Sequence, residues 1–261
     1  MGHEEQFPVS ISLILPAYNE VHCIAQTIKE AKAYFTQRQL IHEIIVSADG
    51  DDGTRELVAD LAKADSALKV MGNVERRGKG YGIRRAVALA KGQIIGFSDA
   101  DNKTPIDEFD KILPFLREGY DVVIGSRGLR ESRIETPQSF YRRLGSKGFA
   151  VFMHMLVGLH EIIDTQCGFK FLQRQAALNV FGRQRIDGYM FDVEILYLAQ
   201  QAGHCIAQVP VRWRDDGDSR LALLSGNIQN VIDLFRIRLH GARQPVFTPA
   251  IDGVKTETWR G

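Results

Sequence analysis

Short apolar runs alternate with helix-like segments along the first half of the chain. Between the runs, apolar residues recur every three or four positions, which is typical of an amphipathic helix. Strands that alternate with helices in this way predict a mostly parallel sheet with helices on both faces. We expect strands at 9–16, 42–49, 67–72, 93–101 and 120–127, and helices at 20–35, from residue 54, at 80–92 and at 105–117.

The second half of the chain has a less regular pattern. Its apolar run 162–172 carries Asp164, Thr165 and Gln166 in its middle, and we assign no element to it. No repeat or linker divides the chain, so we expect one domain over residues 1–224, followed by a C-terminal amphipathic helix and tail over 225–261. The other elements expected are a polar loop at 128–140, helices at 141–157, 190–203 and 227–239, a strand at 204–213 and a loop at 215–221.

Composition and charge narrow the class of protein. Of 261 residues, 44% are hydrophobic and 25% are charged, which suffices for a sizeable core, and the net charge of +1 argues against nucleic acid as a partner. The three cysteines show no metal-ligand spacing and suit a reducing compartment. The first residues lack the pattern of a signal peptide, and no run is long enough to span a bilayer. We therefore expect a soluble, cytoplasmic protein, and the sequence does not define its oligomeric state.

Motifs rich in polar residues and glycine follow four of the expected strands. PAYNE ends the first strand, DGDDGT follows the second, DADNKTP follows the fourth and GSRG follows the fifth. The carboxyl ends of parallel strands meet at one edge of a sheet, and ligands bind beyond that edge. The four motifs are therefore expected to form one site.

Two carboxylates lie one residue apart in the third of these motifs. Asp99 and Asp101 repel each other unless a cation or water neutralises them, and Lys103 follows two residues later. The alternation of side chains along a strand places both acids on one side, where they can hold a divalent cation. A solvated acidic turn would also explain the pair.

Six motifs in this order resemble one known family. They are PAYNE, DG after the second strand, GKG at 78–80, DAD at 99–101, GSR at 125–127 and DTQCGFKFL at 164–172. Together they resemble the family 2 glycosyltransferases of GT-A fold. Within that family the chain looks most similar to the polyprenyl-phosphate sugar transferases, meaning the dolichyl-phosphate glucosyl- and mannosyltransferases. The resemblance covers about 9–239 and implies a Rossmann-like, mostly parallel central sheet.

The resemblance implies a nucleotide-sugar site built on these motifs. Asp99 and Asp101 are expected to be catalytic and to hold a divalent metal, Mg²⁺ or Mn²⁺, which neutralises the leaving diphosphate. Lys103 departs from the glutamine of the mannosyl branch: a charged lysine cannot bind a metal, so it either contacts phosphate or points away. The residues expected to bind the nucleotide sugar, with Asp49 facing the base, are Pro16, Ala17, Tyr18, Glu20, Asp49, Lys79, Asp99, Ala100, Asp101, Arg214 and Arg220.

A group of basic residues is expected to bind an acceptor phosphate. Arg127 ends the fifth strand, and Arg142 and Arg143 open the next helix. Arginine suits phosphate because its planar guanidinium donates two parallel hydrogen bonds. A phosphate monoester already carries a nucleophilic oxygen, so no catalytic base is strictly required. Arg127 and Asp164 complete the expected catalytic residues, and Asp164 has three open roles: base, organiser of the acceptor site, or cap of a turn.

The function implied by the resemblance is an inverting, metal-dependent hexosyltransferase that moves a sugar from a nucleotide sugar to a polyprenyl phosphate. The motif DTQCGFK favours UDP-glucose as the donor, and the spacing of RDDGDSR makes GDP-mannose the second choice. Two alternatives stay open. One is a family 2 transferase acting on a soluble or another lipid acceptor. The other is a nucleotide-sugar-binding module without turnover, supported by Ala48 and Lys103, which depart from the family pattern.

A lipid acceptor lies in a bilayer, so we expect peripheral contact with the cytoplasmic face of a membrane. The helix expected at 227–239 combines an apolar stripe with arginines, which suits an interface with anionic headgroups. Packing of the same stripe on the domain is the competing interpretation. The stripe consists of Ile228, Val231, Ile232, Leu234, Phe235 and Leu239, with Arg236, Arg238 and Arg243 nearby.

Overall fold

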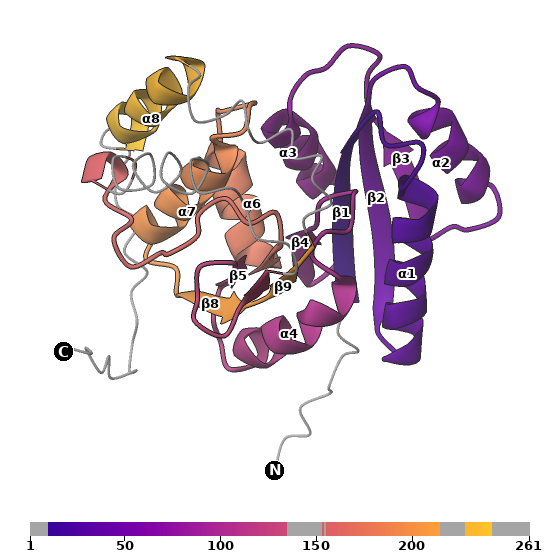
Figure 1. Cartoon of the computed structure of the whole chain (residues 1–261), viewed down its shortest axis with the longest axis horizontal. Helices are drawn as coiled ribbons and strands as arrows, with labels where there is room; N and C mark the ends of the chain where they lie inside the picture. The colour runs from indigo at the N-terminus through magenta and orange to yellow at the C-terminus, as the bar shows by residue number, and fades with distance from the viewer. Residues whose placement is uncertain (1–9, 135–152, 154, 215–227, 242–261) are drawn as a thin grey trace.

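A seven-stranded sheet forms the centre of the molecule, with helices packed on both of its faces (Figure 1). The structure is a computed structural model and describes residues 10–134, 153, 155–214 and 228–241. Within these residues, no helix is both long enough and apolar enough to cross a membrane. Of the expected acceptor and donor residues, Arg142, Arg143 and Arg220 lie outside the described residues.

The elements follow the alternation predicted for the first half of the chain. The strands are β1 (Ser10–Tyr18), β2 (Ile41–Asp49), β3 (Leu68–Met71), β4 (Ile94–Phe97), β5 (Val122–Ser126), β6 (Arg133–Ile134), β7 (Lys170–Gln173), β8 (Ile206–Pro210) and β9 (Arg212–Trp213). The helices are α1 (Ile24–Gln37), α2 (Thr54–Ala62), α3 (Lys79–Leu89), α4 (Phe109–Arg117) after the short 3₁₀ helix η1 (Ile106–Glu108), α6 (Arg174–Arg183), α7 (Phe191–Gln201) and α8 (Ile228–Gly241).

The central sheet has the strand order β3-β2-β1-β4-β7-β5-β8. All neighbouring strands run parallel except β7, which is antiparallel to both β4 and β5. The mostly parallel sheet that the sequence predicts is thus confirmed. A separate parallel pair, β6 with β9, lies outside this sheet.

Three expectations about the elements need correction. The strand expected over 93–101 ends at Phe97, because the acidic motif that follows forms turns and not extended backbone. The run 162–172, which had no assigned element, contains β7, and α6 follows it without having been expected. The loop expected at 128–140 includes the short strand β6. Most of the helix expected at 141–157 lies outside the described residues, although 153 and 155–157 are helical.

Side chains along the strands alternate between two hydrophobic cores, one on each face of the sheet. On β1, Ile11, Leu13 and Leu15 join a core with α1 and α4, while Ile14 joins the opposite core with α3, α6 and α7. This period of two is the physical reason why strands covered on both faces are apolar at successive positions. Both faces of the sheet are therefore covered by apolar side chains, and the polar motifs lie at its carboxyl edge.

The final helix packs only part of its apolar surface on the domain. Leu234 and Ile237 are buried and belong to the core that contains α7, which α8 contacts. On another side of α8, Ile228, Ile232, Phe235 and Leu239 are exposed. The structure thus confirms the expected amphipathic helix and gives it two apolar sides, one of them open to solvent.

Candidate active site

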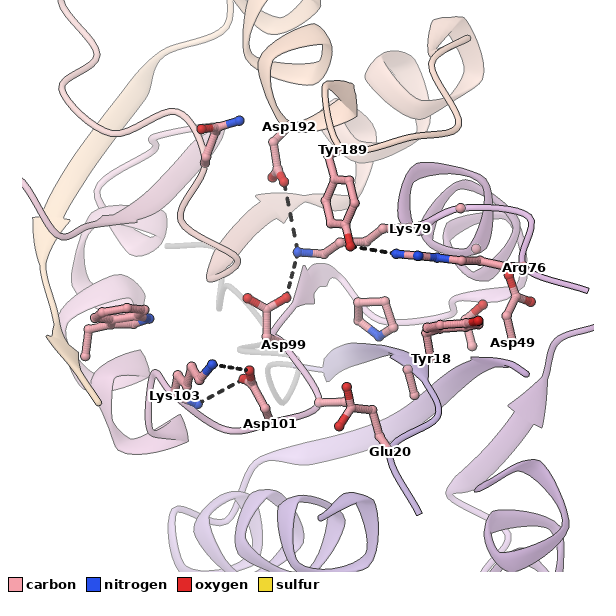
Figure 2. Close-up of a pocket in the computed structure, with 18 of the residues that line it drawn as sticks. Tyr18, Glu20, Asp49, Arg76, Lys79, Asp99, Asp101, Lys103, Tyr189 and Asp192 are labelled. Carbon is pink, nitrogen blue, oxygen red and sulfur yellow. Dashed lines mark hydrogen bonds and ion pairs between the residues drawn. The ribbon is translucent and has the colours of Figure 1, made fainter. Parts of the chain in front are cut away.

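A pocket of about 400 Å³ opens at the carboxyl edge of the parallel strands (Figure 2). Its walls come from the ends of β1 and β2, from the acidic motif after β4, from the first turn of α3 and from the region before α7. The motifs expected to meet at one edge of the sheet do meet there. The expected site residues that line it are Pro16, Ala17, Tyr18, Glu20, Asp49, Lys79, Asp99, Ala100, Asp101 and Arg127.

Each acid of the DAD motif is paired with a lysine. Lys79 Nζ donates a hydrogen bond to Asp99 Oδ1 at 2.6 Å, and Lys103 Nζ lies 3.2 Å from Asp101 Oδ2. Burial raises the pKa of Asp101 and the charge of Asp99 raises it further, while Lys103 lowers it. Burial lowers the pKa of Lys79, but the charges of Asp99 and Asp192 outweigh this and leave it above its ordinary value. Lys103 thus pairs with Asp101, an arrangement that differs from both orientations expected for it, contact with phosphate or pointing away.

Behind these acids lies a buried chain of alternating charges. Lys79 Nζ lies 4.0 Å from Asp192 Oδ2 in the first turn of α7, and Asp192 Oδ1 accepts a hydrogen bond from Lys170 of β7. Lys170 has no exposed surface and also donates to the carbonyl oxygen of Cys167 at 2.6 Å. A buried charge is tolerated only when it is paired and hydrogen-bonded. Asp192 and Lys170 therefore hold Lys79 at the pocket wall, and neither residue was expected to belong to the site.

Gly168 of the motif DTQCGFK lies directly beside the acidic pair. A Cβ atom at this position would lie 2.1 Å from Asp99 Oδ2, so only glycine lets the backbone approach the carboxylate this closely. The antiparallel direction of β7 is what brings this segment there, because its first residues lie at the carboxyl edge of the parallel strands.

Asp49 lies at the other end of the pocket and holds the loop after β3. Its Oδ1 accepts hydrogen bonds from the backbone and side-chain nitrogens of Asn73, both at 3.1 Å, and its Oδ2 accepts one from the backbone N–H of Arg77 at 2.8 Å. The guanidinium of Arg76 lies 4.4 Å from the ring centre of Tyr18. Arg76 was not expected to be a site residue, although it stands directly before the RGKG motif.

Arg127 and Asp164 form a two-pronged ion pair beside the pocket. Arg127 Nε donates to Asp164 Oδ2 at 2.7 Å, Nη2 donates to Oδ1 at 2.9 Å, and the backbone N–H of Arg127 donates to Oδ2 at 2.9 Å. Burial raises the pKa of Asp164, but the charge and hydrogen bonds of Arg127 outweigh this and lower it to about 2. A carboxylate of such low pKa is a poor proton acceptor. Asp164 Oδ1 also accepts a hydrogen bond from the backbone N–H of Gln166 at 3.2 Å, so of the three open roles the geometry favours the cap of a turn and, through Arg127, the organiser of the acceptor site over the base.

The remaining wall of the pocket includes Gln166 and Trp213, neither of which had been expected as a site residue. The guanidinium of Arg127 lies 5.5 Å from the ring centre of Trp213. Arg214 follows Trp213, and its backbone N–H donates to the carbonyl oxygen of Lys103 at 2.9 Å. Arg214 is thus joined through its backbone to the acidic motif but does not line the pocket.

The carboxylates at the pocket suit a metal ion whose remaining ligands are the oxygen atoms of a bound phosphate group. No group of three or more histidine, cysteine or acidic side chains suited to a metal occurs among the described residues. Mg²⁺ and similar ions bind nucleotide phosphates through one or two carboxylates and the phosphate oxygens. Asp99 and Asp101 both reach the pocket, so they provide such a pair.

Comparison with known proteins identifies the class of this chain. Residues 12–181 match the model of the family described as glycosyl transferase family 2. A dolichyl-phosphate beta-glucosyltransferase of Trichomonas vaginalis is 33% identical over 246 residues, covering 89% of this chain and 72% of the relative. A dolichyl-phosphate beta-glucosyltransferase of Drosophila melanogaster is 32% identical over 248 residues, covering 90% and 76%. The chain is a glycosyltransferase that belongs to glycosyl transferase family 2.

Solved structures confirm the fold. Mannosyl-3-phosphoglycerate synthase from Rubrobacter xylanophilus superposes with a TM-score of 0.68 at 20% identity, covering 94% of this chain and 79% of that one. Glucosyl-3-phosphoglycerate synthase from Mycobacterium tuberculosis, in complex with Mn²⁺ and uridine-diphosphate-glucose, gives a TM-score of 0.60 at 20% identity, covering 87% and 79%. At this identity the likeness concerns the fold, which is the GT-A fold that the sequence predicts.

Proposed function

We propose that this enzyme transfers glucose from UDP-glucose to dolichyl phosphate or a related polyprenyl phosphate, with inversion and with a divalent metal. The relatives named above, similar over about nine-tenths of the chain, are dolichyl-phosphate beta-glucosyltransferases. The observation that carries the proposal is that one pocket joins the acidic pair to Arg127. Asp99 and Asp101 suit a metal-bound diphosphate, and Arg127 suits a second phosphate. A donor with two phosphates and an acceptor with one would use all of these groups.

The residues of the pocket divide into a leaving-group side and an acceptor side. Asp99 and Asp101 would hold the metal, which neutralises the charge that develops on the departing diphosphate. Lys79 and Lys103 place two further positive charges beside the same acids. The acceptor phosphate oxygen attacks the anomeric carbon, forms the new C–O bond as the bond to UDP breaks, and needs no proton removed. Arg127, oriented by Asp164, would align that phosphate.

A transfer assay with purified protein tests donor and acceptor together. We expect label from UDP-glucose to appear on dolichyl phosphate with Mg²⁺ or Mn²⁺, and to be absent with EDTA. GDP-mannose is the competing donor, and simple alcohols are the competing acceptors. Transfer to alcohols but not to the lipid phosphate would contradict the acceptor. Nucleotide binding by calorimetry without transfer to any acceptor would identify the non-catalytic module.

The open side of α8 supports peripheral contact with the membrane that carries the acceptor. Ile232 and Phe235 are 41% and 47% exposed on the same helix as Arg236 and Arg238. Apolar side chains beside arginines suit the surface of an anionic bilayer. The buried Leu234 keeps the helix on the domain, so packing and membrane contact use different sides of α8.

Vesicle sedimentation tests this contact. The double change Ile232→Ser and Phe235→Ser should reduce binding to vesicles that contain anionic lipid at low salt. Leu89→Ser, at a residue 54% exposed on α3, is the matched control and should bind like the wild type. If the wild type stays unbound, or if both variants bind equally well, α8 does not meet the membrane.

A further inference from the structure

Lys103 contacts both oxygen atoms of Asp101. Its backbone N–H donates to Asp101 Oδ1 at 3.3 Å, and its Nζ lies 3.2 Å from Oδ2 (Figure 2). The side chain of Lys103 is 13% exposed and that of Asp101 is 35% exposed, so water screens the pair only in part. The oxygen atoms that a metal would use are therefore already engaged by a residue of the same loop.

The formal charges of the acidic pair are balanced by the two lysines that contact it. Asp99 and Asp101 carry two negative charges, and Lys79 and Lys103 carry two positive ones. Behind them, Asp192 and Lys170 neutralise each other. A divalent cation entering alone would leave two uncompensated positive charges in a partly buried site, which is costly. The diphosphate of a nucleotide sugar brings two negative charges, so cation and diphosphate together restore the balance.

We propose that Lys103 is a built-in counter-ion that competes with the metal for Asp101 until a nucleotide diphosphate binds. The diphosphate offers Lys103 new oxygen acceptors and offers the metal additional ligands, so Asp101 is released to the metal. Metal and nucleotide sugar then bind with positive coupling, and each strengthens the other by the same factor. The inference rests on the proposed function in one respect, that the ligand of this pocket carries a diphosphate.

Direct Mn²⁺ binding to the free protein tests the competition without any sugar transfer. Electron paramagnetic resonance or calorimetry would measure the dissociation constant of Mn²⁺ in the absence of nucleotide. Lys103→Gln should tighten it by about tenfold, because it removes a positive charge next to the metal ligands. Lys103→Arg keeps the charge and should remain weak, like the wild type. Asp101→Asn in the Lys103→Gln background should remove the gain, which assigns the gain to this site.

The matched control is Lys63→Gln, at an exposed lysine that pairs with Asp60 at 2.7 Å away from the pocket. Its Mn²⁺ affinity should equal that of the wild type, and circular dichroism and thermal melting would confirm that every variant is folded. Unchanged or weaker Mn²⁺ binding by Lys103→Gln would overturn the proposal.

The coupling itself is measured with UDP-glucose as the probe. Mn²⁺ should tighten the binding of UDP-glucose by a larger factor in the wild type than in Lys103→Gln. An equal factor in both proteins would also overturn the proposal. These outcomes differ from a failure of the proposed function, which would appear as absent transfer to dolichyl phosphate with the Mn²⁺ results unaffected.

Discussion

The substitution Asp164→Asn separates the roles that this carboxylate can have. The side chain of Asp164 is 12% exposed, and its two oxygen atoms accept hydrogen bonds from the guanidinium and the backbone of Arg127 and from the backbone N–H of Gln166. Asparagine keeps the size of the side chain but removes its charge, and the amide nitrogen cannot accept a hydrogen bond. The variant therefore leaves the partly buried guanidinium of Arg127 without its counter-charge.

The expected loss of stability follows from the pKa of Asp164. Its lowering from 3.8 to about 2 in the folded protein means that the ionised form is favoured by about 2 kcal/mol. A carboxyl group whose pKa is depressed by folding stabilises the protein above its unfolded pKa, and that stabilisation is lost as the pH falls through the folded pKa. We therefore expect Asp164→Asn to be about 2 kcal/mol less stable at pH 7, with the gap closing between about pH 4 and pH 2.

Urea unfolding of the two proteins at pH 7 and at pH 3 measures the gap. Asp187→Asn is a matched control, because Asp187 pairs with Arg84 at 2.7 Å but its side chain is 50% exposed. The control should lose no more than about 0.5 kcal/mol. If Asp164→Asn were as stable as the control at pH 7, or if its loss did not change with pH, the ion pair with Arg127 would not be a stabilising contact.

Steady-state kinetics of Asp164→Asn distinguish the two roles that Asp164 can have in catalysis. If Asp164 orients Arg127, the KM for the acceptor phosphate should rise more than the KM for the nucleotide sugar. If Asp164 were the base, kcat should fall by about 10²- to 10⁴-fold while the acceptor still binds. The second result would refute the assignment made from its low pKa.

Three further substitutions probe the pocket. Asp101→Ala should lower sugar transfer by at least about 100-fold with an unchanged melting temperature, because the side chain serves the diphosphate and not the core; activity within a few-fold of wild type would contradict this. Gly168→Ala should displace Asp99 and weaken Mn²⁺ binding in the presence of UDP, measured by calorimetry; unchanged binding would show that the backbone yields. Asp49→Ala should weaken UDP binding about tenfold, because the loop that ends at Arg77 loses its anchor, while Mn²⁺ binding stays the same.

The sequence pattern predicts the parallel part of the fold because strands and helices alternate there, and each is visible in a short stretch of sequence. β1, β2 and β5 lie where apolar runs were seen, and the polar motifs at their ends meet in the pocket. β7 escaped prediction for a physical reason. It is only four residues long, and its first residue, Lys170, is a charged side chain with no exposed surface. Periodicity assigns such a residue to the surface, whereas its pairing with Asp192 in α7 allows it to be buried.

Side-chain partners were less predictable than positions. Asp49 was expected to face a nucleotide base, but its carboxylate also holds Asn73 and Arg77. The pairing of Lys103 with Asp101 was not among the two orientations expected, which were contact with phosphate and pointing away. Such contacts depend on how loops from separate strands approach one another, and the spacing of residues within one motif carries no information about that approach.

The position of β7 in the sheet has a consequence for how the protein folds. β7 lies between β4 and β5, yet β4 ends at Phe97 and β7 begins only at Lys170. Contacts so distant along the chain are entropically costly to close and form slowly. Until β7 inserts, β4 and β5 both present unpaired edges, which are prone to aggregation. Gly168 also does not reach Asp99 until β7 has paired with β4 and β5. We therefore expect an incompletely synthesised chain to be inactive and dependent on protection by chaperones, because the insertion of β7 both joins β4 to β5 and brings Gly168 to Asp99.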